Sequence, residues 1–429
     1  MYRNALVAII GTFLLLGVAC GGGGDDADDT SDKTDKTETA EKAGTADKTD
    51  EADTDDKADK ADKADKTEAA DERDEKDKTD KPPAAENEPT IEGLYAAMLG
   101  PDDIEALLPR PESWWPNFPE FNVGFDPTPS GIEGEQFWVA QSYEHVTRTA
   151  NERLQATLIL FDTEQSAEEG LAAITSINDE DSETLKGPSV GDESRYFTRE
   201  GDASDPEGPP PLETTLRFRV GPVVGRISFL SGDEFQEPEY MAEFFTQIED
   251  DIEAFIEGTL EPARLPGWMS ELMPSDDAVE SAGVGPVFGT ATVPLESWAL
   301  VDSTGDPNAV RDRLEELGAT TLGLRRYGVS GEADLVVETV LLRMADEDAA
   351  ASWAQEFVDG SPEEFALDPG DTGRVSAFTS NEGTFYELQF ARGDVVGDVS
   401  CFAPFGETSD ACEEPVRVLA EAWYAELPK

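Results

Sequence analysis

Two stretches of the chain share one pattern: Phe218-Arg219-Val220-Gly221-Pro222-Val223-Val224-Gly225-Arg226-Ile227-Ser228 and Phe390-Ala391-Arg392-Gly393-Asp394-Val395-Val396-Gly397-Asp398-Val399-Ser400. The residues Phe, Gly, Val-Val-Gly and Ser coincide at a constant offset of 172 positions. In each stretch a turn containing glycine separates two apolar runs, which is typical of a β-hairpin. The match predicts an internal repeat, with hairpin turns at residues 220–222 and 392–394.

Three further blocks match in the same order along the chain. Residues 191–195 match 370–374, residues 157–161 match 340–344, and residues 107–109 echo 272–274. Four ordered matches favour a duplicated domain over generic α+β patterning. We expect one repeat domain over residues 91–262 and a second over 263–429, lengths that allow each copy its own core.

Each copy shows the same order of expected elements. Apolar alternation predicts two strands, and Thr163 or Asp346 then caps a helix with an apolar stripe. A Gly-Asp turn leads into a β-meander, and a final helix closes the copy. The expected strands are 137–145, 154–161, 322–329 and 335–344, and the expected helices are 164–177, 238–256, 307–317, 347–358 and 413–427. The predicted fold class is α+β: two tandem copies of a small antiparallel sheet with helices packed on one face, preceded by a disordered acidic tether.

The N-terminus reads as an export signal. Arg3 precedes an uncharged apolar run over residues 5–18, which is shorter than the roughly 20 residues that span a bilayer. The run ends in Leu16-Gly17-Val18-Ala19-Cys20, which resembles the bacterial lipobox, although Gly17 stands where that family usually has Leu. The resemblance implies a lipoprotein signal peptide over residues 1–19 and a lipid on Cys20. The alternative is an ordinary signal peptide that leaves Cys20 unmodified.

Lipidation would place the protein in the cell envelope, on the outer side of a bacterial membrane and facing the periplasm or the exterior. No Asp follows Cys20, so the family pattern favours the outer membrane if the host has one. Residues 20–90 are expected to form a disordered acidic tether, because from Asp25 onward they contain almost only Asp, Glu, Lys, Thr and Ala and no aromatic residue.

The charge limits the partners. The chain has a formal net charge of -63, which argues against nucleic acid as a partner. Residues 91–429 hold 69 acidic residues, 17 arginines and two lysines, Lys186 and Lys429. An acidic surface poor in lysine suits a saline exterior, so a salt-adapted source is one hypothesis and an ordinary soluble acidic surface is the other.

The repeat also carries a resemblance. The leucine-rich strand before a capped helix, the Gly-Asp turn and the Phe-x-x-Gly-x-Val-Val hairpin resemble repeated extracytoplasmic domains of bacterial lipoproteins, including the mycobacterial sensor type. These features cover most of residues 100–429 but occupy scaffold positions. The resemblance therefore implies an extracytoplasmic location and a fold more than an activity.

Few residues point to covalent chemistry. Cys401 and Cys412 are expected to form a disulfide in an oxidising compartment, and a catalytic thiol pair is the weaker alternative because the spacing is not the redox one. The single histidine, His145, argues against a His-rich zinc site and is expected at the surface or in a turn. The sequence contains no phosphate-binding loop and no Gly-x-Ser-x-Gly elbow.

Two features are candidate binding surfaces. The first is the tract of Trp114, Trp115 and Phe118, which is either a packed plug over the sheet or an exposed recognition surface. The second is the acid-base set that recurs in both copies, Asp192 with Arg195 and Asp371 with Arg374. Its structural interpretation is a turn held by an Asp-to-backbone hydrogen bond and an ion pair.

We therefore expect a non-enzymatic binding or interaction module, without cofactor or metal, held on a membrane by its lipid and contacting an envelope protein or a small ligand. The alternative is an extracytoplasmic hydrolase that uses acidic residues in a cleft between the copies. A Ca²⁺-dependent adhesion module is a third possibility.

Overall fold

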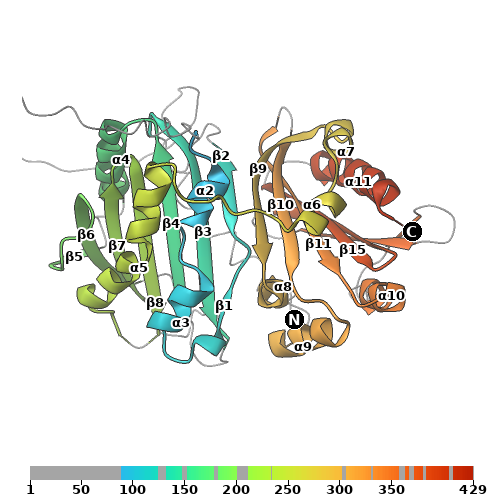
Figure 1. The fold of residues 1–429 in the computed structure, drawn as a ribbon, viewed down its shortest axis with the longest axis horizontal. Coiled ribbons are helices and arrows are strands. Elements are labelled where there is room, and N and C mark those ends of the chain that lie inside the picture. The colour runs from blue at the N-terminus through green and yellow to red at the C-terminus, as the bar shows by residue number, and fades with distance from the viewer. Residues whose placement is uncertain are drawn as a thin grey trace, which may run out of the picture. The chain divides into compact units, whose positions relative to one another are not determined.

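The two matching hairpins lie within two antiparallel sheets in the computed structural model of the chain (Figure 1). The first joins β7 (Leu212–Val220) to β8 (Val223–Ser231), and the second joins β14 (Gly383–Arg392) to β15 (Val395–Pro404). Gly221 and Gly393 at the turns have φ angles of +52° and +56°. Glycine adopts this left-handed conformation without the steric cost that a side chain would bring, so the predicted hairpins are confirmed.

The structure describes residues 88–123, 132–146, 152–177, 182–200, 211–232, 234–301, 306–329, 332–356, 363–366, 372–379, 383–404 and 409–428. Cys20, the predicted signal peptide over 1–19 and nearly all of the predicted tether over 20–90 lie outside these ranges.

The first sheet has eight strands. Its order is β1-β3-β4-β8-β7-β6-β5, and β2 also pairs with β3. The remaining bounds are β1 Trp114–Pro116, β2 Glu120–Val123, β3 Glu135–His145, β4 Arg153–Phe161, β5 Glu183–Leu185 and β6 Glu193–Glu200.

The second sheet has seven strands in the order β9-β10-β11-β15-β14-β13-β12. The bounds are β9 Val284–Val293, β10 Leu322–Val329, β11 Glu332–Arg343, β12 Glu363–Ala366 and β13 Thr372–Thr379. From β3 and β10 onward the two orders correspond strand for strand, which supports the duplication read from the sequence.

Helices lie against both faces of each sheet. In the first sheet the consecutive residues Val223 and Val224 belong to different apolar clusters, and consecutive strand residues point to opposite faces. Val223 shares its cluster with Phe244 of α5 (Pro238–Ile256), and Val224 shares its own with Leu171 of α4 (Glu164–Ile177). The antiparallel α+β class is thus confirmed, but the helices cover two faces where we expected one.

The second sheet repeats this arrangement. Val395 clusters with Trp423 of α11 (Ser409–Glu426), whereas Val396 clusters with Trp353 of α10 (Glu347–Glu356). The helix α11 begins four residues before the predicted start at residue 413, and its first turn is tied to β15 by the disulfide between Cys412 and Cys401. The other predicted helices and the predicted strands match the observed bounds within three residues where the structure describes them.

Several short helices complete the described chain: α2 Ile91–Ala96, α3 Pro101–Leu107, η1 Pro111–Ser113, α6 Gly267–Leu272, α7 Asp276–Ser281, α8 Leu295–Val301 and α9 Pro307–Glu316. The predicted caps are present: the backbone N–H groups of Ser166 and Ala349 donate to Thr163 and Asp346. Asp306 caps α9 in the same way, by accepting from the N–H of Asn308. Within the described ranges, no helix is both long enough and apolar enough to span a bilayer.

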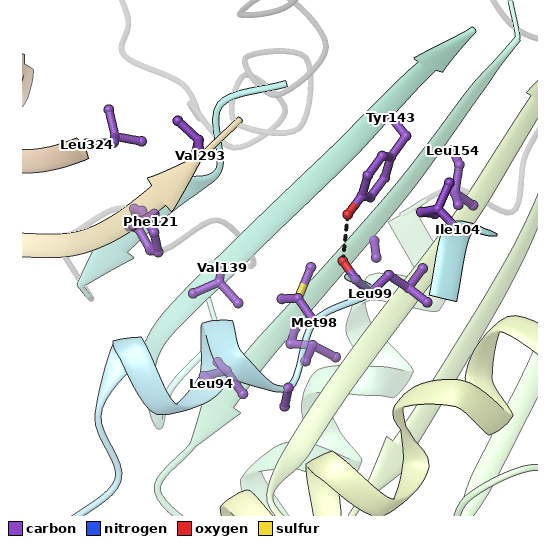
Figure 2. Packing of buried hydrophobic residues seen from close by; sticks show 14 of the residues in the cluster. Leu94, Met98, Leu99, Ile104, Phe121, Val139, Tyr143, Leu154, Val293 and Leu324 are labelled. Atoms are coloured by element: carbon purple, nitrogen blue, oxygen red, sulfur yellow. Dashed lines mark hydrogen bonds between the residues drawn. The ribbon is translucent and has the colours of Figure 1, made fainter. Parts of the chain in front are cut away.

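One apolar cluster contains residues of both sheets. Phe121 and Val139 of the first sheet share it with Val293 and Leu324 of the second (Figure 2). The hydroxyl of Tyr143 donates a hydrogen bond of 2.9 Å to the carbonyl of Leu99, three residues after the end of α2. The division at residues 262 and 263 falls between α5 and α6, and separate folding of the two copies stays a prediction.

Candidate binding site

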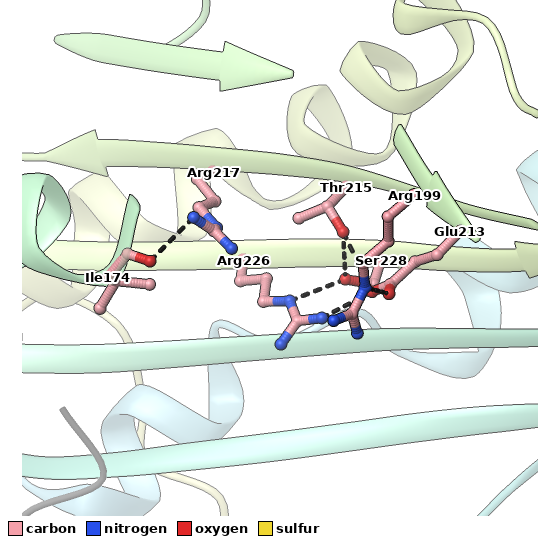
Figure 3. Close-up of polar contacts among 7 residues, drawn as sticks. All are labelled: Ile174, Arg199, Glu213, Thr215, Arg217, Arg226 and Ser228. Carbon is pink, nitrogen blue, oxygen red and sulfur yellow. Dashed lines mark hydrogen bonds and ion pairs between the residues drawn. The ribbon is translucent and has the colours of Figure 1, made fainter. Parts of the chain in front are cut away.

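A polar network occupies the face of the first sheet on which α4 packs (Figure 3). The carboxylate of Glu213 on β7 is 3% exposed and accepts hydrogen bonds from two arginines. Arg226 Nη2 lies 2.6 Å from Oε1, and Arg199 Nε binds Oε2. Burial alone would raise the pKa of Glu213, but Arg226 and Arg199 outweigh it and hold that pKa down at about 2.

Two hydroxyl groups close the inner side of this network. The oxygens of Thr215 and Ser228 lie 2.9 Å apart, and Thr215 also donates to Glu213 Oε1 over 3.1 Å. Arg226 Nε donates to Ser228 Oγ over 2.8 Å. The buried end of the network is therefore satisfied, and its two guanidinium groups extend from it toward solvent with 39% and 24% of the Arg199 and Arg226 side chains exposed.

A third arginine, Arg217, connects this face to α4. Its Nη1 donates to the carbonyl of Ile174 over 2.9 Å, and its guanidinium carbon lies 4.8 Å from the ring centre of Phe197. Arg217 is directly opposite Arg226 on β8 and Arg195 on β6. We call this set the arginine face: Arg195, Arg199, Arg217 and Arg226 with Glu213, Thr215 and Ser228.

The same positions in the second sheet carry acidic and amide groups. Asp398 takes the place of Arg226, Gln389 that of Arg217, and Glu387 that of Thr215, at the offset of 172. Aromatic residues occupy the two positions that correspond to the ion pair of Arg199 and Glu213. Phe385 replaces Glu213, and Phe378, its partner on the neighbouring strand, replaces Arg199. We call this set the acidic face: Glu338, Glu387 and Asp398 with Arg326, Gln389 and Ser400.

The acidic face is incompletely satisfied. Asp398 is 2% exposed, and its Oδ2 has no hydrogen-bond partner. Gln389, directly opposite, is 1% exposed and also lacks partners for its side-chain amide. Burial, with repulsion from Glu387 and Glu338, raises the pKa of Asp398 well above its ordinary value. Arg326 Nε neutralises Glu338 at 2.5 Å.

The aromatic tract lies in the core. Trp114 and Trp115 are 5% and 3% exposed, and the Trp114 ring packs on His145 and Phe229 at 5.2 and 5.6 Å. Arg311 of α9 stacks on Trp115 at 5.1 Å. Phe118 is half-buried, with its ring 6.2 Å from that of Trp298. The packed alternative describes these side chains, and we do not place them in the binding surface.

The Gly-Asp turn is held together by Asp192, although not by the expected ion pair. Asp192 accepts hydrogen bonds from the N–H of Gly221 at 2.7 Å and from Arg219 at 3.1 Å, which ties it to the tip of the β7–β8 hairpin. Arg195 pairs instead with Glu193 at 2.8 Å. In the second copy, Asp371 and the side chain of Arg374 lie outside the described residues.

His145 differs from its expected place. It ends β3, as predicted, but it is 7% exposed, because Trp114 packs on its ring, and its Nδ1 lies 3.5 Å from Glu152. Side chains along β3 alternate between its two faces, so His145 lies on the same face as Tyr143, two residues earlier. Because Tyr143 belongs to the core side, this alternation was the signal that His145 is buried. The disulfide between Cys401 and Cys412 is present, which confirms that prediction and excludes a free thiol pair in this state. No group of three or more acidic, Cys or His residues is placed to hold a metal ion in the part of the chain that the structure describes.

The sequence did not single out Glu213, Arg199, Arg226 or Asp398. The repeat could have indicated them, because the corresponding positions of the two copies differ in charge although the flanking Gly and Ser are the same in both.

Comparison with known proteins gives no family. No protein-family model matches the chain, and no curated protein matches it. Among solved structures, the extracellular domain of PknH from Mycobacterium tuberculosis aligns with 37% of this chain and 96% of that domain, at 11% identity and a TM-score of 0.28.

Proposed function

We propose that the chain is a cell-envelope lipoprotein whose duplicated sheets form a non-enzymatic binding module, and that the arginine face contacts the ligand. The observation that carries the binding role is the change of charge between the copies: Arg226 corresponds to the acidic Asp398, and Arg217 corresponds to the neutral Gln389. A purely structural network would be expected to keep its chemistry in both copies, since the surrounding scaffold is the same. The Phe-x-x-Gly-x-Val-Val-Gly frame has kept its residues, whereas the polar side chains on the α4 and α10 side have diverged.

The location rests on the sequence of the N-terminus. A lipid on Cys20 would hold the folded copies outside the cytoplasm, and the disulfide between Cys401 and Cys412 is compatible with an oxidising compartment. Stable anchoring needs two or three acyl chains. Mass spectrometry of the mature polypeptide from its native host tests this part: we expect an N-terminal Cys20 bearing acyl chains, and a bare thiol or an uncleaved Met1 would overturn it.

The binding role is tested with envelope extract. The full chain and an Arg226→Gln variant, each immobilised at equal density, are compared for the molecules that they retain. We expect at least one component to be retained by the wild type and lost from the variant, while Arg264→Gln, outside the arginine face, retains it. Identical retention by all three proteins would contradict the assignment of the arginine face.

One observation favours the hydrolase alternative. Asp398 is a buried acid with a raised pKa beside Glu387 and Glu338, and raised carboxyl pKa values are common in catalytic acids. The second candidate is therefore an acid-base hydrolase centred on Asp398. Turnover of an envelope glycan or ester that disappears in Asp398→Asn, with folding kept, would establish it. We favour binding, because Asp398 is 2% exposed and a catalytic acid must reach its substrate.

A further inference from the structure

We infer that Arg199 and Arg226 together bind an oxyanion, such as a phosphate group, on the solvent side of Glu213. This inference rests on the proposed binding function and names the chemistry of its ligand. Both guanidinium groups have unused donors. Each guanidinium carries five N–H groups; Arg199 uses its Nε, and Arg226 uses its Nε and Nη2. Among the described residues, Arg199 Nη1 and Nη2 and Arg226 Nη1 have no hydrogen-bond partner.

The geometry brings these donors together. Arg199 on β6 and Arg226 on β8 are separated by one strand, β7, and Glu213 on that strand holds both side chains with its two carboxylate oxygens. Two like charges repel each other. The buried carboxylate of Glu213 offsets this repulsion and holds the two guanidinium groups side by side. Planar guanidinium groups bind tetrahedral and planar oxyanions through paired N–H donors.

The charge balance points the same way. Glu213 neutralises one of the two arginines, which leaves one positive charge at the pair. The neighbouring Arg195 is already paired with Glu193. An oxyanion bound between Arg199 and Arg226 would restore neutrality there. The repulsion of anions by a chain of net charge -63 makes non-specific anion binding weak, so binding at this pair would stand out.

The second sheet lacks this pair altogether. Phe378 and Phe385 occupy the positions of Arg199 and Glu213, and Asp398 occupies that of Arg226. One oxyanion site per chain is therefore expected, in the first copy.

Titration calorimetry on the full chain tests the site, with inorganic phosphate at constant ionic strength and chloride as the competing anion. We expect one phosphate per chain in the wild type and at least tenfold weaker binding in Arg199→Gln, which leaves Glu213 paired with Arg226. The matched control is Arg313→Gln, an arginine on α9 that pairs with Glu316 at 2.8 Å; its affinity should equal that of the wild type. A second arm with soluble polyphosphate at equal phosphoryl concentration separates the sources: tighter binding assigns a phosphate polymer, and equal binding assigns a single anion.

Two results would overturn the inference: no phosphate binding by a wild-type chain that is shown to be folded, or equal binding by wild type and Arg199→Gln. Thermal unfolding of each variant shows that it is folded. If phosphate does not bind while an envelope component is still retained through Arg226, the proposed binding function stands and only the oxyanion is wrong. If neither is seen, both fail.

Discussion

The ring of Phe390 lies over Gly397, its direct partner across the β14–β15 hairpin, and Phe218 lies over Gly225 in the same way. Each ring also meets an aromatic side chain of the closing helix: Phe218 meets Phe245 at 4.7 Å, and Phe390 meets Trp423 at 5.3 Å. The Phe and Gly that the two copies share are thus one packing unit, in which the glycine provides the space that the ring fills.

This relationship predicts that Gly225→Ala and Gly397→Ala each destabilise the protein, by about 2 kcal/mol, because the new methyl group would overlap the ring in a filled core. The matched control is Gly232→Ala, since a methyl group there would meet no atom within 4 Å. Denaturant unfolding followed by tryptophan fluorescence measures the difference. Equal midpoints for Gly225→Ala and Gly232→Ala would show that the ring moves aside freely.

The scaffold was readable from the sequence because it repeats. The bounds of α4, α5 and β10 coincide with the predicted ones, since apolar periodicity and the cap at Thr163 are local signals. The two-sided covering of each sheet was missed, because Val223-Val224 and Val395-Val396 show only that both faces are apolar and not which helix covers which.

The candidate site was not readable in the same way. Glu213, Arg199 and Arg226 come from three strands, and only their register brings them together. The charge reversal between Arg226 and Asp398 was visible when the two copies were aligned, but its meaning depends on these side chains lying on the faces that α4 and α10 cover. The sequence left two interpretations of the tract at Trp114, a packed plug over the sheet or an exposed recognition surface, because aromatic residues next to proline are compatible with both.

Glu213→Gln should destabilise the protein by about 2 kcal/mol at pH 7, because the buried acceptor of two guanidinium groups loses its charge. The pKa of Glu213 is about 2 in the folded protein, below the ordinary value of 4.5. Its stabilising contribution is therefore full above pH 4.5 and is lost as the pH falls from 4.5 to 2. Urea unfolding over this range should show a shallower loss in the variant than in the wild type.

The control for Glu213 is Glu193→Gln, whose partner Arg195 has 43% of its side chain exposed. Exposed ion pairs contribute between about 0 and 1 kcal/mol, so this variant should unfold close to the wild type. Equal effects of the two substitutions would contradict the view that burial makes the Glu213 network strong.

Loss of the disulfide should affect the second copy. Cys401 and Cys412 are 11 residues apart in sequence and join β15 to the first turn of α11. The chain-entropy model gives about 3 kcal/mol for a loop of this order, so the double variant Cys401→Ser, Cys412→Ser should unfold at lower denaturant. Reducing agent should bring the wild type to the same midpoint and leave the variant unchanged; a further effect of reductant on the variant would point to another thiol.

Asp398→Asn should stabilise the protein at neutral pH. The folded protein holds the pKa of Asp398 well above the ordinary 3.8, chiefly through burial, with Glu387 and Glu338 adding repulsion. A raised carboxyl pKa means that the folded state binds the proton more tightly than the unfolded state, so stability from this group is greatest below pH 3.8 and declines as the pH rises from there toward the folded pKa. Asparagine has the same shape without the charge, and it removes this decline.

The expected gain above that window is about 1–3 kcal/mol, because the variant no longer has to bury a charge, although its amide remains a buried polar group. Urea unfolding at pH 4 and pH 8 measures it: wild type and Asp398→Asn should be alike at pH 4 and differ at pH 8. The control is Asp394→Asn at the hairpin tip, where the carboxylate pairs with the half-exposed Arg343 at 2.7 Å. If Asp398→Asn is instead less stable at pH 8, the Asp398 carboxylate makes favourable interactions in the folded protein, and the view that its burial is costly is wrong.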